Sequence, residues 1–338
     1  MALVKVGVFT GNGVDARGIT GIGFAPDFVL VKENSLNAFN FRYGLAGDDS
    51  WFGGGASGNT DRIQSLDADG FTTGLTAINA DTKLNYYLAI KAEAADSKSG
   101  GYTGDGANDR NLAVVGFTPR FVLIGGSQFT SESWAYTDLH AADGSQAFAG
   151  GAATADRIQA IIANGFQVGT NVAVNLNLQP NYYLALLDKT NKIKVIVYTG
   201  NGTTLSVAGV GFRPQFILIL KTSAGSDVGF KFKDETTTNS FTKGSVEGAN
   251  GIDSFDANGF TVSGGFNTNL ATYVALALSD GVVGGGKGRG NPNKGGGGSG
   301  PPPWANPGGN NPTNPPPTPP PVLNRANAKR YFIGRPWW

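Results

Sequence analysis

The stretch GFAPDFVLVK, residues 23–32, returns as GFTPRFVLIG at 116–125 and as GFRPQFILIL at 211–220. Each version ends in an apolar run without the alternation of a half-exposed strand, which predicts a strand covered on both faces. The proline before each run has no N–H to donate to a ladder and marks the entry to the strand. The sequence therefore predicts the same central strand three times.

Three further phrases accompany that strand in every copy, always in the same order. The first copy reads FTGNG from Phe9, IQSLDADGFTTG from Ile63 and NYYLAI from Asn85. The later copies begin these phrases at Tyr102, Ile158 and Asn181, and at Tyr198, Ile252 and Thr272. Each repeat is roughly 90 residues long and can close a small core alone. The units of solenoids and propellers, at ~20–50 residues, cannot.

We therefore predict three homologous domains, at residues 1–94, 95–191 and 192–280, which pack on one another. Three linked copies would then stand where a symmetric trimer otherwise would. A linear string of domains would refute this idea.

Short strands and tight turns are expected within each repeat, because Gly, Thr, Asn and β-branched or aromatic residues dominate. Val4, Val6 and Val8 alternate with other residues and predict an opening strand with one buried face. The last strand, 86–90, alternates in the same way. The Asn-Gly and Asp-Gly pairs of the first phrase supply the positive φ values of tight turns.

The third phrase predicts a hairpin around Asp69-Gly70 and its counterparts in the other copies. In the second copy, residues 156–163 are rich in Ala and Ile, and a short helix is the alternative there. Together the patterns predict an all-β protein with three tandem β-sandwich or jelly-roll-like domains of about six to nine strands each.

The composition excludes several kinds of site. The chain has no cysteine and one histidine, His140, which excludes disulfides, cysteine-based metal centres and histidine clusters. Residues 1–10, MALVKVGVFT, have the pattern of a strand rather than of a signal peptide, and no apolar run approaches the ~18 residues of a membrane span. We expect no membrane insertion and no cofactor.

Candidate catalytic side chains are few. Asp61-Arg62 and Asp156-Arg157 occupy one place in the first two copies, but the third has Asn250-Gly251 there. We interpret the pairs as ion pairs or turn contacts beside the hairpin, and the lone His140 as a packed or surface side chain. A glycan depolymerase would need a placed carboxylate pair, and none is evident, so no enzymatic activity is predicted.

Acidic residues in turns raise the alternative of a calcium site. Asp48-Asp49 and the pair Asp105 and Asp109 lack the spacing of a known calcium loop, and Asp is common in turns. We predict no bound metal.

Aromatic residues raise the alternative of a sugar-binding platform, because their faces stack on sugar rings. The candidates are Tyr86-Tyr87, Tyr182-Tyr183, Trp51 and Trp134. The tyrosines lie on a strand predicted to be central, so core packing is the favoured interpretation. Recognition is instead expected in the stretches that differ between copies, about 33–60, 126–155 and 221–249.

The remaining chain is different in kind. Residues 281–338 hold seven basic residues and no acidic one, whereas residues 1–280 hold 19 basic and 25 acidic residues, a net charge of −6. Residues 281–321 are rich in Gly and Pro, which predicts an extended linker without a core.

Residues 322–338 combine aromatic and basic side chains, the types that carry binding energy in protein interfaces. We predict a docking peptide there, because exposed tryptophans on an idle tail would favour aggregation. Nucleic acid is a weaker candidate partner, since the charges are widely spread. The predicted docking residues are Arg325, Lys329, Arg330, Tyr331, Phe332, Arg335, Trp337 and Trp338.

The four phrases together resemble a domain family of bacteriophage structural proteins, especially tail-fibre-like and other virion-surface proteins. The resemblance covers residues 1–280 and is weaker in the third copy. It implies a β-sandwich, lectin-like fold and a place on a virion, and it supplies no catalytic residues.

The leading hypothesis is a non-enzymatic virion protein, assembled in the host cytoplasm as a capsid decoration or a tail or fibre component. Its tail would bind other virion proteins of the capsid or tail. The alternative is an adhesin that binds host-surface glycans through its variable stretches.

Overall fold

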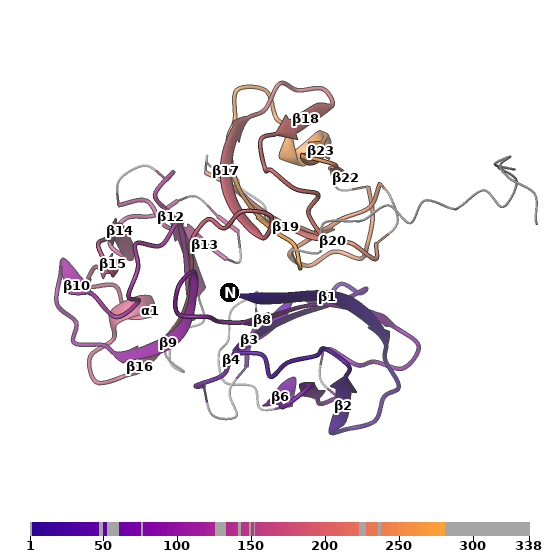
Figure 1. Ribbon diagram of the computed structural model, residues 1–338, viewed down its shortest axis with the longest axis horizontal. Helices are drawn as coiled ribbons and strands as arrows, with labels where there is room; N and C mark the ends of the chain where they lie inside the picture. Colours follow the sequence, from indigo (N-terminus) through magenta and orange to yellow (C-terminus); the bar gives the residue numbers. More distant parts are fainter. Residues whose placement is uncertain are drawn as a thin grey trace, which may run out of the picture. The chain divides into compact units, whose positions relative to one another are not determined.

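A computed structural model of the protein describes residues 2–46, 50–52, 61–75, 77–125, 133–140, 143–148, 150–151, 153–222, 228–235, 238–249 and 251–280. The predicted linker and docking peptide, at 281–338, lie outside this part. The described elements are antiparallel strands, apart from one helical turn, α1 (Val172–Asn175), and one 3-10 turn, η1 (Gly264–Phe266). The prediction of an all-β fold is confirmed (Figure 1).

The strands recur in the same order in each copy. The first copy has β1 (Leu3–Thr10), β2 (Arg17–Thr20), β3 (Phe28–Glu33), β4 (Asn40–Tyr43), β5 (Trp51–Phe52), β6 (Ile63–Asp67), β7 (Gly70–Thr73) and β8 (Leu84–Lys91). The second has β9 (Ser97–Thr103), β10 (Arg110–Leu112), β11 (Phe121–Gly125), β12 (Ser133–Thr137), β13 (Gln146–Ala147), β14 (Ile158–Ile162), β15 (Gly165–Val168) and β16 (Pro180–Leu186). The third has β17 (Ile193–Thr199), β18 (Leu205–Ala208), β19 (Phe216–Lys221), β20 (Val228–Phe232), β21 (Phe241–Thr242), β22 (Ile252–Asp256), β23 (Gly259–Val262) and β24 (Thr272–Leu278).

Each copy forms two sheets. In the first copy, a five-stranded sheet in the order β1-β8-β3-β4-β5 lies on a three-stranded sheet in the order β2-β7-β6, and the other copies repeat both orders strand for strand. Eight described strands lie in each of the ranges 1–94, 95–191 and 192–280, and the division into three domains stays a prediction. Independent folding of a single copy stays a prediction.

The central strands are buried on both faces, as the apolar runs predict. On one face of β3, Val29 and Val31 pack with Phe71 in the interior of the first sandwich. On the other face, Phe28 and Leu30 pack against residues of the other two copies. The same division holds for β11 and β19.

The predictions from alternation were partly wrong. Tyr86 and its neighbours up to Ile90 are all buried, because the face expected to meet solvent is covered by the other copies. In the opening strand Val4 and Val6 are buried, but Val8 is 41% exposed, because this part of the edge strand β1 lies outside the shared core.

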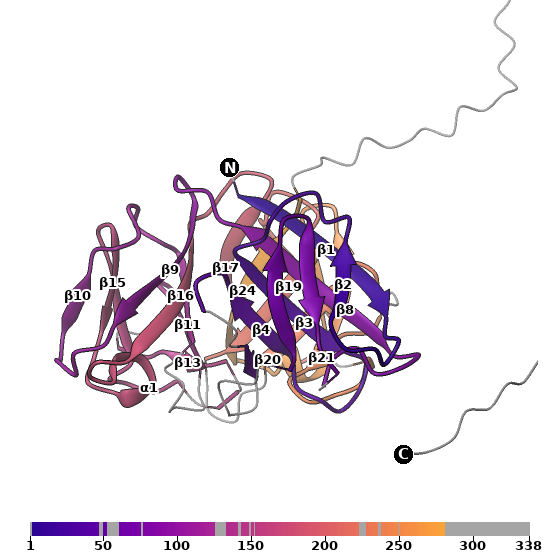
Figure 2. The ribbon, with the colours of Figure 1, turned by 90° about the horizontal axis from the view of Figure 1, so that it is seen from below.

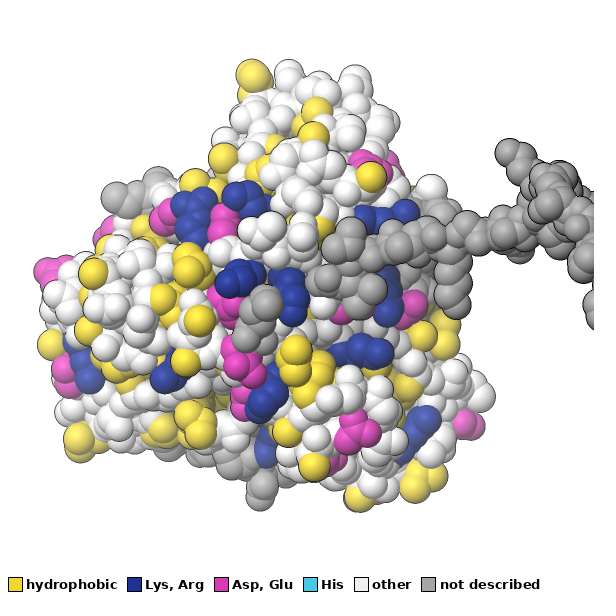
Figure 3. All heavy atoms as spheres, viewed as in Figure 1, with side chains coloured by type: hydrophobic (Ala, Val, Ile, Leu, Met, Phe, Trp, Pro, Cys, Tyr) yellow, Lys and Arg dark blue, Asp and Glu magenta, His cyan; other side chains and the backbone are white. Residues whose placement is uncertain are grey.

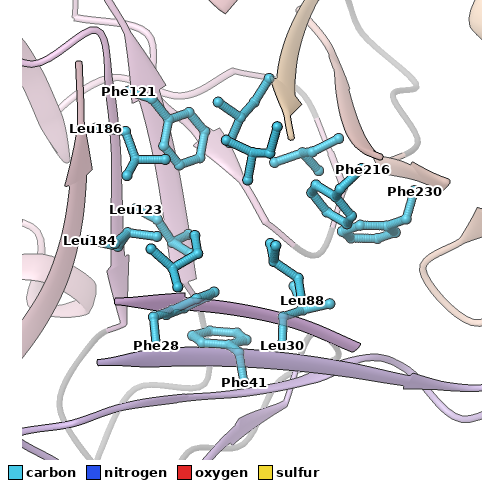
Figure 4. Packing of buried hydrophobic residues seen from close by; sticks show 14 of the residues in the cluster. Phe28, Leu30, Phe41, Leu88, Phe121, Leu123, Leu184, Leu186, Phe216 and Phe230 are labelled. Carbon is cyan, nitrogen blue, oxygen red and sulfur yellow. The ribbon is translucent and has the colours of Figure 1, made fainter. Parts of the chain in front are cut away.

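Equivalent residues of the three copies meet in one shared apolar core (Figure 4). The three five-stranded sheets each turn one face towards it, so the copies surround a common axis rather than form a line (Figure 1). The register of β3 with β8, and of its counterparts, defines the matching positions. Three such sets are Phe28, Phe121 and Phe216; Leu30, Leu123 and Leu218; and Leu88, Leu184 and Leu276.

The next layer of the core departs from this symmetry. Phe41 and Phe230 are matched in the second copy by the small Ala135. Phe148, from another part of the second copy, supplies the missing volume with its ring centroid 5.7 Å from Phe41 and 5.9 Å from Phe230. Dense packing is thus kept without keeping the sequence pattern.

The predicted turns and hairpins are confirmed. Gly13, Gly106 and Gly202 have φ values of 63°, 70° and 78°. The third phrase forms the hairpins β6–β7, β14–β15 and β22–β23. Because Ile158–Ile162 is a strand, the helical alternative for the second copy is wrong.

Candidate binding surface at the turn end

The eight predicted docking residues lie in 322–338, outside the described residues, so their role stays a prediction. The structure instead shows that the described part of residues 2–280, called here the body, has two different ends.

At one end, called here the connection end, the described chain starts, passes between copies at 92–96 and 187–192, and stops. The N–H of Ala2 donates to Asp96 Oδ1 (2.9 Å), and Lys192 Nζ donates to the carbonyl of Ala2 (3.0 Å). The N–H of Ser279 donates to the carbonyl of Lys192 (2.9 Å). These bonds gather all the passages of the chain at one end of the body (Figure 2).

Ion pairs concentrate at the connection end. Lys194 pairs with Asp188 (2.7 Å), Lys189 with the buried Asp96 (3.5 Å), and Arg120 with Asp188 (3.9 Å). Figure 3 shows basic and acidic side chains side by side between the sandwiches on this face. A pocket of about 290 Å³ lies beside these residues, and its two lysines already pair with carboxylates.

The opposite end, called here the turn end, carries the FTGNG turn of each copy. The N–H of Asn12 donates to Asn79 Oδ1 (3.1 Å), while Asn79 Nδ2 donates to the carbonyl of Val14 (2.8 Å). Gly11 admits no side chain, since a Cβ would meet the carbonyl of Ala80. The buried Asn79 thus holds the turn closed, which explains why the phrase recurs.

Sequence reasoning missed this asparagine and its counterparts, Asn175 and Asn267. Asn175 Oδ1 accepts from the N–H of Asp105 (3.0 Å), and Asn267 Oδ1 accepts from the N–H of Asn201 (2.8 Å). All three are buried. Their fixed distance before the last strand was the available signal, although they stand outside the quoted phrases.

Two turn-end residues combine strain with exposure. Leu178 has φ 60° and is 76% exposed, and Leu270 has φ 59° and is 81% exposed. They occupy the same turn position as Thr82, at φ 63°. A leucine in the left-handed region is unusual, and backbone strain of this kind is concentrated at functional sites. These turns are therefore candidates for contact with a partner.

The variable stretches of the first and third copies meet at this end. The N–H of Glu247 donates to Asn34 Oδ1 (2.8 Å), and Tyr86 donates its hydroxyl to Glu247 Oε2 (2.8 Å). Residues from two separate stretches thus form one continuous surface. Recognition by these stretches stays a prediction.

Buried charge lies behind this surface. Lys32 is fully buried and donates to the carbonyls of Glu33 (2.6 Å) and Ser35 (2.9 Å), and burial lowers its pKa to about 7. Glu235 accepts from the N–H of Phe232 (2.9 Å), and burial raises its pKa to about 9. Burial therefore favours the protonated form of Glu235, whose titration is linked to that of the neighbouring Lys231.

The aromatic candidates for a sugar platform are core residues, as the favoured interpretation held. Trp51 and Trp134 are buried, and so are Tyr86, Tyr87 and Tyr183. Tyr182 is partly buried and packs on Tyr43 and Trp51 of the first copy.

The candidate acidic residues are engaged in turns. Asp61 accepts from the N–H of Leu75 (3.4 Å), and Asp156 accepts from the hydroxyl of Thr170 (2.6 Å). Asp105 pairs with Arg110 (3.0 Å). The described residues contain no group of three or more acidic or histidine side chains placed to hold a metal ion. The calcium candidates Asp48 and Asp49 lie outside the described residues.

His140 is buried and stacks on Tyr136, with ring centroids 5.5 Å apart. Its Nδ1 accepts from the N–H of Thr137 (3.1 Å), and burial lowers its pKa to about 4. The imidazole is therefore neutral at pH 7, as a packed side chain.

No protein-family model matches the chain, and no curated protein matches it. Among the described residues, no helix is long and apolar enough to cross a membrane.

Proposed function

We propose that the protein is a non-enzymatic structural component of a bacteriophage virion. Its three-copy body would stand on the particle surface as a capsid decoration or a tail or fibre component. The C-terminal segment would bind other virion proteins. The resemblance of the four phrases is the reason for proposing a virion protein. The structure supports separate roles for the body and the C-terminal segment.

One observation carries this division: the last described residues leave the body at the connection end. The N–H of Ser279 donates a hydrogen bond to the carbonyl of Lys192 there, whereas the variable stretches around Asn34 and Glu247 meet at the turn end. A segment that follows Asp280 is thus suited to anchoring a body whose turn end stays free to make other contacts.

Reattachment to particles that lack the protein tests the proposal. Full-length protein should bind, and a variant carrying Tyr331→Ala, Phe332→Ala, Trp337→Ala and Trp338→Ala should bind at least tenfold more weakly, because aromatic side chains carry much of an interface's energy. A turn-end control, Leu178→Asn with Leu270→Asn, should bind as the wild type does. Equal binding of all three proteins would refute anchoring by the tail.

Adhesion to a host-surface glycan is the second candidate. The meeting of two variable stretches at the turn end favours it, since one surface there has contributions from two copies. Full-length protein should then bind particular glycans, and the turn-end leucine variants should lose that binding. Absence of binding to any host-surface glycan would count against adhesion and leave the anchoring proposal untouched.

A further inference from the structure

Each copy presents two surfaces to the other copies beside the shared core. The central face lies on the two central strands, and in the first copy it carries Tyr86 and Lys32, which stand opposite each other in the register of β3 with β8. The edge face lies on β4, β5 and the turn after β4. In the first copy it carries Tyr43, Trp51 and Ala46, whose N–H donates to the carbonyl of Tyr43 (3.1 Å).

The central face of the second copy packs on the edge face of the first. The Tyr182 ring lies 6.3 Å from that of Tyr43 and 5.4 Å from that of Trp51, between centroids. Gly125 stands opposite Tyr182, and a Cβ there would lie only 2.8 Å from Tyr43 Cε2 and 3.2 Å from Trp51 Cε2. The hydroxyl of Tyr43 donates to the carbonyl of Leu123 (3.3 Å), which holds the ring in this place. This contact therefore has no room for a side chain at residue 125.

The central face of the first copy packs on the edge face of the third in the same way, but with other residues. The Tyr86 ring lies 5.8 Å from that of Phe232 and 5.4 Å from that of Phe241. Lys32 stands at the place of the glycine, with its Nζ 4.7 Å from the centroid of Phe241. Glu235 stands at the place of the alanine, since its N–H donates to the carbonyl of Phe232 (3.1 Å). Burial lowers the pKa of Lys32, whereas the charges of nearby carboxyl groups, including Glu235, raise it.

The remaining pair of faces has a third combination. On the central face of the third copy, Val274 and Leu220 stand opposite each other. On the edge face of the second copy, Thr137 and Gln146 take the places of the two aromatic rings, and both are fully buried. The three central faces and the three edge faces thus differ together in size and in charge.

We infer that these residues determine which copies can meet, because a central face closes only on the edge face that matches it. The central face of the first copy does not fit the edge face of the first copy. A lysine at the place of Gly125 would overlap Tyr43 and Trp51, and its amine would find Ala46 where the third copy supplies Glu235. Buried charged groups cost stability, and selecting one arrangement over its competitors is their best-attested role. Like copies of two chains are thereby kept apart, whether or not the protein belongs to a virion.

Gly125→Lys in the full-length protein tests the matching, because it gives the second copy the central face of the first. The short connection holds this face against the edge face of the first copy at a high effective concentration. The melting temperature should nevertheless fall by at least about 6 °C, since the buried amine has neither room nor a carboxyl partner. Adding Tyr43→Phe, Trp51→Phe and Ala46→Glu reproduces the edge face of the third copy and should restore at least half of the loss.

The three edge-face substitutions without the lysine are the matched control. They should lower the melting temperature on their own, because Gly125 leaves the space of the indole unfilled and the new carboxyl group is buried without an amine. Matching requires that the combined variant lose less than the sum of the two separate losses. Losses that simply add would overturn the proposal.

A milder pair of substitutions keeps the test decisive if Gly125→Lys does not fold. Gly125→Ala should lower the melting temperature, because its Cβ meets the fixed ring of Tyr43. In a Tyr43→Phe background the loss should be at least halved, since the ring is no longer held by its bond to Leu123 and can move, as the ring of Phe232 can. Equal losses in the two backgrounds would also overturn the proposal.

Discussion

His140 and Glu235 occupy the same place in the second and third copies, where each accepts the N–H of the last residue of its strand. Both side chains are buried, and burial favours the neutral form of each. For His140 the folded pKa of about 4 lies below the ordinary 6.5, so the associated stability is present above pH 6.5 and is lost as the pH falls towards 4. We predict a loss from this group on the order of 2–3 kcal/mol between pH 7 and pH 4.

Replacement by Gln isolates this effect from that of the carboxylates. The free energy of unfolding of wild type minus that of His140→Gln should fall by this amount over the same pH range, measured by denaturant titration. Because His140 is the only histidine, its ring resonances in an NMR titration report the pKa directly. A midpoint near 6.5 in the folded protein would contradict the prediction.

The turn-end leucines are predicted to reduce stability. Glycine adopts the left-handed region without a steric penalty, and Leu178 and Leu270 are too exposed to contribute much packing. Leu178→Gly and Leu270→Gly should therefore each raise the free energy of unfolding by about 0.5–1 kcal/mol. Leu36→Gly, at an exposed position outside the left-handed region, is the control and should give no gain. A loss of stability in the two turn variants would show that these side chains pack in the folded protein.

At the scale of the strands and turns, the buried charges between β3 and β20 predict opposite pH dependences. Glu235 has a raised folded pKa, so its contribution is complete below pH 4.5 and is lost as the pH rises to about 9. Lys32 has a lowered folded pKa, so its cost falls as the pH rises from about 7 to 10.5. The free energy of unfolding of Glu235→Gln relative to wild type should therefore rise by at least about 1 kcal/mol between pH 5 and pH 9.

The free energy of unfolding of Lys32→Met should exceed that of the wild type most at pH 7 and less at pH 10. A constant difference across this range would refute the buried neutral states.

The strands were predictable because their signals are local. An apolar run such as 28–31 specifies a buried strand, and Asp69-Gly70 specifies a tight turn, whatever surrounds them. The burial of Tyr86 was not predictable, since the residues that pack on it are far away in the sequence. The same holds for Asn79 and Phe148, whose roles depend on what folding brings beside them. The meeting of Asn34 with Glu247 had no signal in either stretch alone.

At the scale of the whole molecule, the shared core should make the three copies unfold together. Leu30, Leu123 and Leu218 fill one layer around the axis, beside an apolar cavity of about 20 Å³. Removing any one of them exposes all three copies to the same loss, so each Leu→Ala variant should cost about 2–5 kcal/mol. The three costs should agree within about 1 kcal/mol, because the positions are equivalent.

Calorimetry distinguishes this from a chain of independent domains. Each variant should show a single unfolding transition at a lower temperature, with a calorimetric enthalpy equal to the van't Hoff enthalpy. The reason is that all three copies contribute to the shared core, so unfolding of one copy disrupts the core for the other two. If the copies were independent, Leu30→Ala would lower the melting of the first copy alone and split the transition. Ile19→Ala, inside the first sandwich and away from the axis, sharpens the comparison. If the copies are coupled through the shared core, Ile19→Ala should also shift the whole transition, because unfolding of the first copy removes one wall of that core.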